Sequence, residues 1–311
     1  MSMDTQETPP GRRHGRDGQD QGAKVLRLRG EASEFERFDT PLRRRGIRAV
    51  PLRVILPNLV TLLALCMGLT AIRFAIEGQF ETAVVAVIAA AILDGLDGRI
   101  ARALRGTSRF GAELDSLADF VAFGVAPALI LYVWGLQKIK SFGWFAALVF
   151  AIAAALRLAR FNVMIDDPDR PPWQAHFFTG MPAPAGAIVG LLPLYLNLSI
   201  FAVPNVRALV PFEIAYVLIV AFLMASRIPH YSGKRIGRVP REYVIAVLFG
   251  IAACLLLLAI FTMEMLIGLT LVYLATIPFA IRRSNAYAAA DAARAANAAA
   301  AGAPPIAQAR K

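Results

Sequence analysis

Long apolar blocks constrain the fold of this chain more than any other feature. From Leu59 onward, apolar residues gather in blocks of roughly 20 residues, the length that an α-helix needs to cross about 30 Å of hydrocarbon. Only 18% of the 311 residues are charged, whereas soluble domains usually carry about 25%. The sequence therefore predicts an all-α, polytopic integral membrane bundle. It argues against a soluble enzyme, a disordered regulator and a fibrous protein.

About eight blocks are candidate transmembrane helices, and polar segments flank them. Residues 1–48 are predicted to be a disordered, basic cytoplasmic segment, and residues 49–283 the membrane domain. Residues 284–311 form an Ala-rich cytoplasmic tail, either a solvated helix or disordered. The candidate spans are about 54–76, 80–103, 112–134, 143–162, 183–203, 209–225, 243–261 and 264–281.

The distribution of basic residues predicts the orientation of the bundle. Loops on the side of the N-terminus hold or adjoin twelve Lys and Arg residues, against three on the other side. The positive-inside rule then places both termini in the cytoplasm, and the segment 94–119 at the cytoplasmic face. The net charge of +11 is explained by topology and contact with anionic lipid headgroups, so no nucleic-acid partner is expected.

The two cysteines, Cys66 and Cys254, each lie within an apolar block. Their number and separation exclude a disulfide framework and a CxxC metal site. Both are expected to pack in the core as small apolar residues.

Four aspartates interrupt the apolar pattern: Asp94, Asp97, Asp115 and Asp119. Carboxylates within membrane spans are costly and usually mark function. The spacings i, i+3 and i, i+4 put each pair on one face of its helix. A short basic link would let the two helices lie antiparallel, so that four carboxylates converge.

Four converging anions need compensation, and divalent cations are the obvious partners. Oxygen ligands favour Mg²⁺ or Mn²⁺ over zinc, and two ions about 4 Å apart suit phosphoryl transfer. A single ion with a spare carboxylate is the alternative. Glycines at 95 and 98 would leave room for a nucleotide, and Arg102 can bind a diphosphate through two nitrogens.

These residues form one recognisable pattern, which spans 94–119. It reads Asp94-Gly-Leu-Asp97-Gly98-Arg-Ile-Ala-Arg102, then eight residues, then Gly111-Ala-Glu-Leu-Asp115-Ser-Leu-Ala-Asp119. It resembles the signature D-x2-D-G-x2-A-R-x8-G-x3-D-x3-D of the CDP-alcohol phosphatidyltransferase family, and every fixed position matches. The resemblance implies a bundle of membrane helices, CDP-diacylglycerol as donor, an alcohol as acceptor and CMP as leaving group.

The resemblance also implies roles for individual residues. The four aspartates would hold two divalent cations, and Asp119 would also take the proton of the acceptor hydroxyl. The residues that would bind the CDP part of the donor are Gly98, Arg102, Ser108 and Asn58, the last within a Pro57-Asn-Leu-Val-Thr61 element. A plain helix start is the alternative explanation of Pro57 and Asn58.

The rest of the chain resembles the branch of this family that uses serine. The similar runs are 110–127, 156–162 and 178–185, while Ala64 stands where many relatives carry a second Asn. Serine is a zwitterion, so its carboxylate needs a cation, and Arg157 and Arg160 are the candidates. Ordinary positive-inside arginines are the alternative.

The sequence thus predicts transfer of a phosphatidyl group from CDP-diacylglycerol to L-serine in a bacterial inner membrane, by what relatives suggest is a homodimer. Another acceptor, such as glycerol 3-phosphate, inositol phosphate or choline, is the main alternative. A cation transporter that uses membrane aspartates is a distant one, because it predicts charges in both halves of the chain and broken helices.

Overall fold

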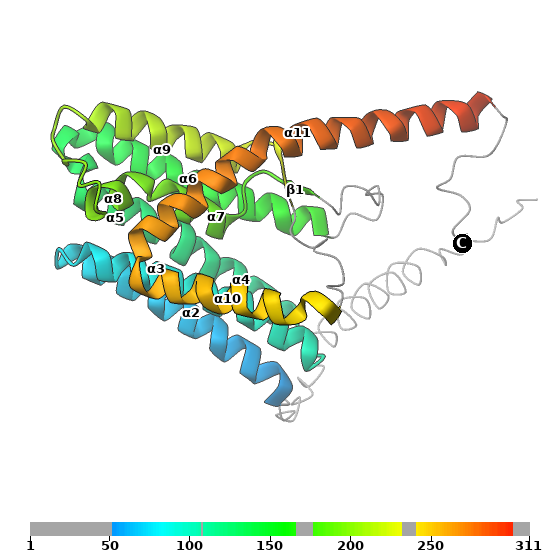
Figure 1. The fold of residues 1–311 in the computed structure, drawn as a ribbon, viewed down its shortest axis with the longest axis horizontal. Coiled ribbons are helices and arrows are strands. Elements are labelled where there is room, and N and C mark those ends of the chain that lie inside the picture. Colours follow the sequence, from blue (N-terminus) through cyan, green and yellow to red (C-terminus); the bar gives the residue numbers. More distant parts are fainter. Residues whose placement is uncertain (1–51, 107, 166–176, 232–240, 301–311) are drawn as a thin grey trace, which may run out of the picture. The chain divides into compact units, whose positions relative to one another are not determined.

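The structure, a computed structural model, describes residues 52–106, 108–165, 177–231 and 241–300 (Figure 1). The predicted segment 1–48 lies outside these residues. All structural statements below concern the described parts of the chain.

Helices dominate the fold and follow the apolar blocks. The helices are α2 Leu52–Ile76, α3 Phe80–Ala103, α4 Arg109–Asp119, α5 Ala126–Trp134, α6 Lys140–Ile165, α7 Ala183–Gly190, α8 Leu192–Leu198, α9 Val210–Ala225, α10 Val244–Ile260 and α11 Thr262–Ala300. Short 3-10 helices span Leu136–Ile139 (η2) and Arg241–Tyr243 (η5), and a π-helix spans Phe120–Val125 (η1). One ladder of two short strands is added, β1 Phe177–Thr179 and β2 Pro229–Tyr231.

The predicted membrane helical bundle is confirmed. Four continuous helical stretches are long and apolar enough to cross a membrane, and α9 and α10 are shorter apolar helices. The predicted span 183–203 is divided into α7 and α8 at Leu191, where Pro193 removes a backbone donor. Residues 284–300 of the Ala-rich tail continue α11 without a break. The number of membrane passes stays a prediction.

The centre of the bundle is held by close contacts between small residues. A β-carbon on Gly68 of α2 would stand 2.8 Å from the Cα of Ala122, and one on Gly124 would stand 2.9 Å from the Cβ of Ala154 in α6. The π-helix η1 therefore fits tightly between α2 and α6. Small residues allow such close approach of membrane helices. Because η1 begins directly after Asp119, this packing fixes the end of α4.

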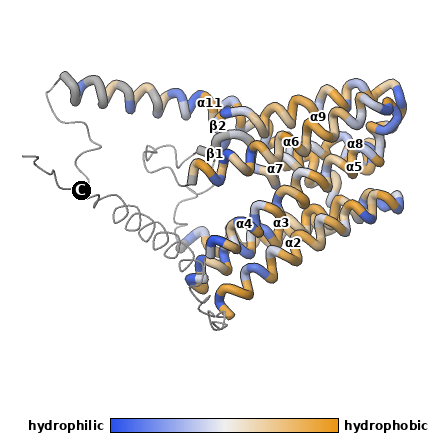
Figure 2. The backbone as a smooth tube through the Cα atoms, turned by 180° about the vertical axis from the view of Figure 1, so that it is seen from behind, coloured by the Kyte–Doolittle hydropathy of each residue, from blue (hydrophilic) through white to orange (hydrophobic). Residues whose placement is uncertain are grey.

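Many large apolar side chains are exposed on the outside of the bundle, as expected for a protein in lipid. Figure 2 shows that hydrophobic residues predominate along most of the helices. Helix α10 is the extreme case, since none of its residues is buried within the chain. Cys66 and Cys254 are exposed on this outer surface, so the prediction that they pack in the core is wrong. An apolar residue of a membrane helix can face lipid as readily as the core, and the sequence pattern does not separate the two.

The helix ends gather at two ends of the bundle. At one end, Lys138 of η2 contacts Asn205. At the other, Asn162 near the end of α6 donates to Ser116 of α4 (3.0 Å), and Arg160 donates to the carbonyls of Ala225 and Ser226 at the end of α9 (2.7 and 3.1 Å). The second end also carries the link between α3 and α4.

The β1–β2 ladder is fixed at the end of α9 by one glycine. Gly180 follows β1 with φ of +80°, and its N–H donates to the carbonyl of Ile228 (3.0 Å). A β-carbon there would stand 2.7 Å from the carbonyl oxygen of Ser226. Glycine satisfies both the left-handed backbone and the close approach. The ladder pairs Phe178 with His230, which brings His230 into the bundle.

We expect Gly68→Ala to destabilise the protein, because the added methyl group meets the backbone of η1. The midpoint of thermal unfolding in detergent should fall by about 5 °C, in line with the cost of overpacking. Gly250→Ala is the matched control, since nothing lies within 4 Å of a β-carbon at that helical position. Equal midpoints for both variants would contradict the tight contact.

Candidate active site

The link between α3 and α4 positions two functional helices against α2. A β-carbon on Gly106 would stand 2.0 Å from the carbonyl oxygen of Arg53, so the link lies directly on the start of α2 and requires glycine there. Ser108 caps α4 by accepting a hydrogen bond from the N–H of Gly111 (3.0 Å). Helix α2 packs against both α3 and α4. The two aspartate pairs therefore face each other.

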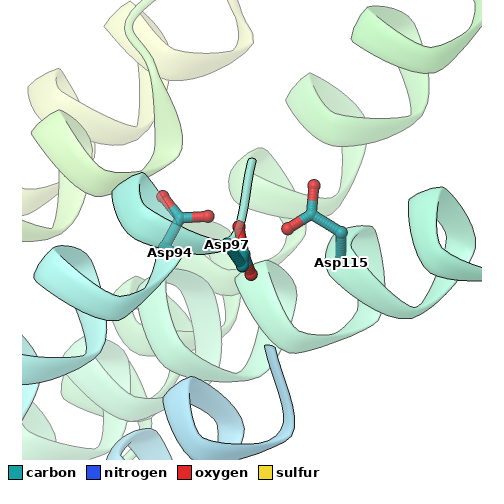
Figure 3. Close-up of side chains that lie close together, drawn as sticks. All are labelled: Asp94, Asp97 and Asp115. Atoms are coloured by element: carbon teal, nitrogen blue, oxygen red, sulfur yellow. The ribbon is translucent and has the colours of Figure 1, made fainter. Parts of the chain in front are cut away.

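Three of the carboxyl groups meet closely (Figure 3). One oxygen from each of Asp94, Asp97 and Asp115 lies within 4.8 Å of the others. Asp119 lies one turn beyond Asp115, and its side chain interacts with that of Asp94. Asp97 is 5% exposed, and the other three are half-buried. We call Asp97 and Asp115 the near pair and Asp94 and Asp119 the far pair, by their distance from the link.

Thr61 of α2 fixes the most buried carboxylate. Its hydroxyl lies 2.7 Å from Oδ2 of Asp97 and 3.2 Å from the carbonyl oxygen of Pro57. The carboxylate can only accept, so the hydroxyl donates to Asp97. This bond orients the carboxylate of Asp97 within the cluster.

The near pair lines a pocket between α2, α3 and α4. Arg102 folds back over Gly98, so that a β-carbon there would stand 3.7 Å from its Nη1. Gly111 lies against Asn58, whose Oδ1 would be 2.7 Å from a β-carbon. Gly98 and Gly111 thus leave space in the pocket, and polar side chains line the rest of it. The lining residues are Pro57, Asn58, Thr61, Asp97, Gly98, Ala101, Arg102, Gly106, Ser108, Gly111, Ala112 and Asp115.

The far pair faces a buried arginine instead. Arg157 of α6 is 7% exposed, and its guanidinium interacts electrostatically with Asp119 and Asp94. The Cζ atom lies 5.3 Å from the centre of the Phe161 ring, a cation–π distance. A cation buried at this position partly offsets the repulsion between the carboxylates.

This arrangement suits a divalent cation and a phosphorylated ligand. Carboxylate oxygens from two helices converge at distances that one hard cation can span. The adjoining pocket combines a glycine-lined wall with the guanidinium of Arg102, which is the geometry that a diphosphate needs. The cluster can therefore hold a metal ion beside a phosphate group.

Comparison with known proteins agrees with this geometry. The sequence model of the CDP-alcohol phosphatidyltransferase family matches residues 54–228, a range that contains all four aspartates and the whole pocket. The chain belongs to this family.

Three curated relatives of this chain carry the name CDP-diacylglycerol–serine O-phosphatidyltransferase. A Mycobacterium bovis protein is 43% identical over 240 residues, covering 76% of this chain and 82% of the relative. A Mycobacterium leprae protein is 44% identical over 247 residues, covering 78% and 79%. A Helicobacter pylori protein is 36% identical over 196 residues, covering 63% and 79%.

The structure brings together most of the residues that the family signature predicts. Asp94, Asp97 and Asp115 meet, and Asp119 interacts with Asp94. Asn58, Gly98, Arg102 and Ser108 line the pocket beside the near pair. Arg157 faces the far pair, and its predicted contact with the acceptor stays a prediction. Arg160 is held instead by the carbonyls at the end of α9. Its predicted contact with substrate stays a prediction, and the structure gives it a packing role.

Sequence reasoning missed three polar residues around the signature of this phosphatidyltransferase. Thr61 was read as part of an element near the nucleotide, and its bond to Asp97 had no local signal. His230 and Tyr273 lie far from the signature in sequence, yet Tyr273 interacts electrostatically with Arg157. For Tyr273, the one available signal in the sequence was its position as a polar residue within an apolar span.

We expect Thr61→Val to weaken binding of a divalent cation, because Asp97 loses the bond that orients it. Loss of such a supporting contact typically lowers metal affinity by about 10- to 100-fold. Binding of Mn²⁺ as a probe can be followed by electron paramagnetic resonance of the free ion. Thr70→Val is the control, since that hydroxyl bonds to its own helix at Cys66. Equal Mn²⁺ affinity in the two variants would contradict the role of Thr61.

Proposed function

We propose that this protein transfers the phosphatidyl group of CDP-diacylglycerol to L-serine, giving phosphatidylserine and CMP. The observation that carries the proposal is the position of the carboxylate cluster between two different environments. A pocket suited to a nucleotide diphosphate adjoins the near pair, and a buried cation suited to an amino-acid carboxylate faces the far pair. The names of the relatives support the same donor and acceptor.

The carboxylates Asp94, Asp97, Asp115 and Asp119 would hold two divalent cations, Mg²⁺ or Mn²⁺. When bound, such ions neutralise charge on the transferring phosphate and on the leaving group. The fit rests on the chemistry of the donor set, since hard oxygen ligands from two helices meet within one ion's reach.

The donor would lie in the near-pair pocket. Arg102 would bind the diphosphate with two nitrogens, since its guanidinium already lies over Gly98. Asn58 and Ser108 would contact the cytidine or its ribose from the α2 side and from the start of α4. The missing side chain at Gly98 leaves the backbone accessible, and the acyl chains would remain in the bilayer.

The reaction then needs one proton acceptor on the opposite side of the phosphate. Asp119 would take the proton of the serine hydroxyl. The hydroxyl oxygen would form a bond to the phosphorus that carries diacylglycerol, and the bond from that phosphorus to the CMP oxygen would break. CMP leaves with the electron pair of that bond, so atoms and charges balance. Arg157 would orient serine through its carboxylate.

The surroundings of the protein follow from its apolar helices and from its charge distribution. Several apolar helices indicate a membrane protein, and we propose the inner membrane of a bacterium with both termini in the cytoplasm. The excess of basic residues beside the α3–α4 link supports a site at the cytoplasmic face, where serine and CMP are soluble. We also propose a homodimer, by analogy with the family.

The alternatives differ in the alcohol or in the class of protein. A phosphorylated acceptor would call for two or three additional cations beside the far pair, and Arg160 is engaged at the end of α9. A cation transporter would need charges in both halves of the bundle, whereas the four aspartates come from one helical hairpin. Both arguments favour serine transfer.

A panel of acceptors tests this function directly. Purified protein with radiolabelled CDP-diacylglycerol and Mn²⁺ or Mg²⁺ should release CMP with L-serine and not with glycerol 3-phosphate, inositol phosphate or choline. The lipid product should migrate as phosphatidylserine. CMP release with another acceptor and none with serine would overturn the assignment of serine while keeping the donor chemistry.

Asp119→Asn should abolish CMP release, because an amide cannot take the proton of the hydroxyl. Binding of CDP-diacylglycerol should be largely retained, since the near-pair pocket is unchanged. Glu113→Gln is the matched control, being an exposed carboxylate on the same helix, and it should keep wild-type turnover. Full activity of the Asp119 variant would refute its role as the base.

A further inference from the structure

Two polar residues outside the family signature, Tyr273 and His230, lie on the side of the bundle that contains Arg157. Tyr273 of α11 interacts electrostatically with the Arg157 guanidinium. The ring of His230 in β2 stacks on that of Tyr273, with centroids 6.0 Å apart and planes inclined by 15°. His230 is 1% exposed and Tyr273 is half-buried. Three side chains from α6, β2 and α11 therefore form one group next to the far pair, which we call the Arg157 cluster.

Each member of the Arg157 cluster presents an unpaired polar atom. Within the described residues, Nε of Arg157, the hydroxyl of Tyr273 and Nε2 of His230 are buried and have no hydrogen-bond partner. Buried polar atoms in native proteins are almost always paired. Arg157 and His230 are both more than nine-tenths buried, and each interacts with Tyr273. Unpaired polar atoms on such linked side chains, near Asp119, indicate a site for a polar ligand.

The hydrogen-bonding capacity of His230 is fixed by its backbone contact. Its Nδ1 lies 2.8 Å from the carbonyl oxygen of Ile228, and a carbonyl can only accept, so Nδ1 carries a hydrogen. Burial lowers the pKa of His230 below its usual range, so the ring is neutral at pH 7. Nε2 is then an acceptor. The Arg157 cluster thus offers a hydrogen-bond donor, Nε–H of Arg157, and an acceptor, Nε2 of His230. The hydroxyl of Tyr273 can donate or accept.

This combination matches the two charged groups of an α-amino acid. Nε–H of Arg157 can donate to a carboxylate, and Nε2 of His230 and the hydroxyl oxygen of Tyr273 can accept from an ammonium group. Choline has neither a carboxylate nor an N–H donor, so its charged group would leave all three atoms unpaired, and a phosphorylated alcohol would find an acceptor where it needs a donor. The cluster therefore fits a zwitterion better than the alternative acceptors.

We propose that Arg157, Tyr273 and His230 form the pocket that binds the α-carboxylate and α-ammonium groups of the acceptor and directs its hydroxyl to Asp119. The pocket rests on the proposed function, since it specifies how serine is recognised. Because Arg157 interacts with Asp119 as well as with Tyr273, an amino acid bound here lies beside the carboxylate that receives its proton.

The position of the cluster in the sequence supports a role in acceptor choice. The family match ends at residue 228, before His230 and Tyr273. The donor pocket and all four aspartates lie within the match. Members of one family that share a donor can differ in their acceptor. Residues that bind the acceptor are therefore expected outside the segment that binds the shared donor.

Kinetics of two variants test the pocket. Tyr273→Phe removes one oxygen, and His230→Asn keeps a nitrogen donor near the carbonyl of Ile228 while removing Nε2. Each should raise KM for L-serine about tenfold, the effect of losing one hydrogen bond to a charged group. KM for CDP-diacylglycerol and kcat at saturating serine should stay within about twofold by the same reasoning. His230→Gln, which can return a polar atom near Nε2, should recover part of the affinity.

The controls separate the pocket from a structural effect and from the proposed function. Tyr243→Phe removes an exposed hydroxyl and should match the wild type. An unchanged KM for serine in both test variants, or a fall in kcat with KM unchanged, would overturn the pocket. So would unfolding of Tyr273→Phe, because that hydroxyl should stabilise nothing before serine binds. Failure of the wild type to use serine would instead refute the proposed function itself.

Discussion

The repulsion among four carboxylates in an apolar bundle is the constraint on which the rest of this structure depends. Asp94, Asp97 and Asp115 present oxygens within 4.8 Å of one another, in surroundings that screen charge poorly. Two contacts supplied by other helices reduce the cost, the Thr61 hydroxyl on Asp97 and the Arg157 guanidinium beside Asp119. Neither neutralises the cluster, so a divalent cation is the natural remaining partner. Without a bound cation, the cluster lowers the stability of the fold. Its conformation is therefore better explained by ligand binding than by a structural role.

The packing around the cluster divides it into two working sides. Gly106 lets the link rest on α2, and the cap at Ser108 starts α4 at the right place. At the other end of α4, the π-helix η1 lies tightly between α2 and α6, and π-helical turns often occur at functional sites. The near pair consequently opens toward glycines and Arg102, and the far pair toward α6. In-line displacement at phosphorus needs a leaving group and a nucleophile on opposite sides, and this division is consistent with the donor and acceptor positions that we propose.

The sequence predicted the parts of this structure that depend on local pattern. Apolar blocks located the helices because membrane thickness sets their length, and the spacing of the aspartates predicted their convergence because helix geometry is periodic. The break at Leu191, the π-helix η1 and the capping of α9 by Arg160 depend on tertiary packing and had no clear local signal. The exposure of Cys66 could not be predicted either, because a residue that faces lipid and a residue that faces the core are both in apolar surroundings. The contact between Tyr273 and Arg157 joins residues too distant for any spacing rule.

The division between shared and specific chemistry has a structural basis in this chain. The near-pair pocket is built from consecutive elements, α2 to α4, and Gly106 lets the link between α3 and α4 lie on the start of α2. Arg157 lies on α6, within the family match, and faces Asp94 and Asp119. His230 reaches it through the β1–β2 ladder, which Gly180 holds against the end of α9, and Tyr273 through α11. If the proposed acceptor pocket is correct, changes in these later elements would alter the ligand that Arg157 binds without disturbing the four aspartates. An acceptor site assembled in this way would allow one phosphoryl-transfer centre to serve different alcohols.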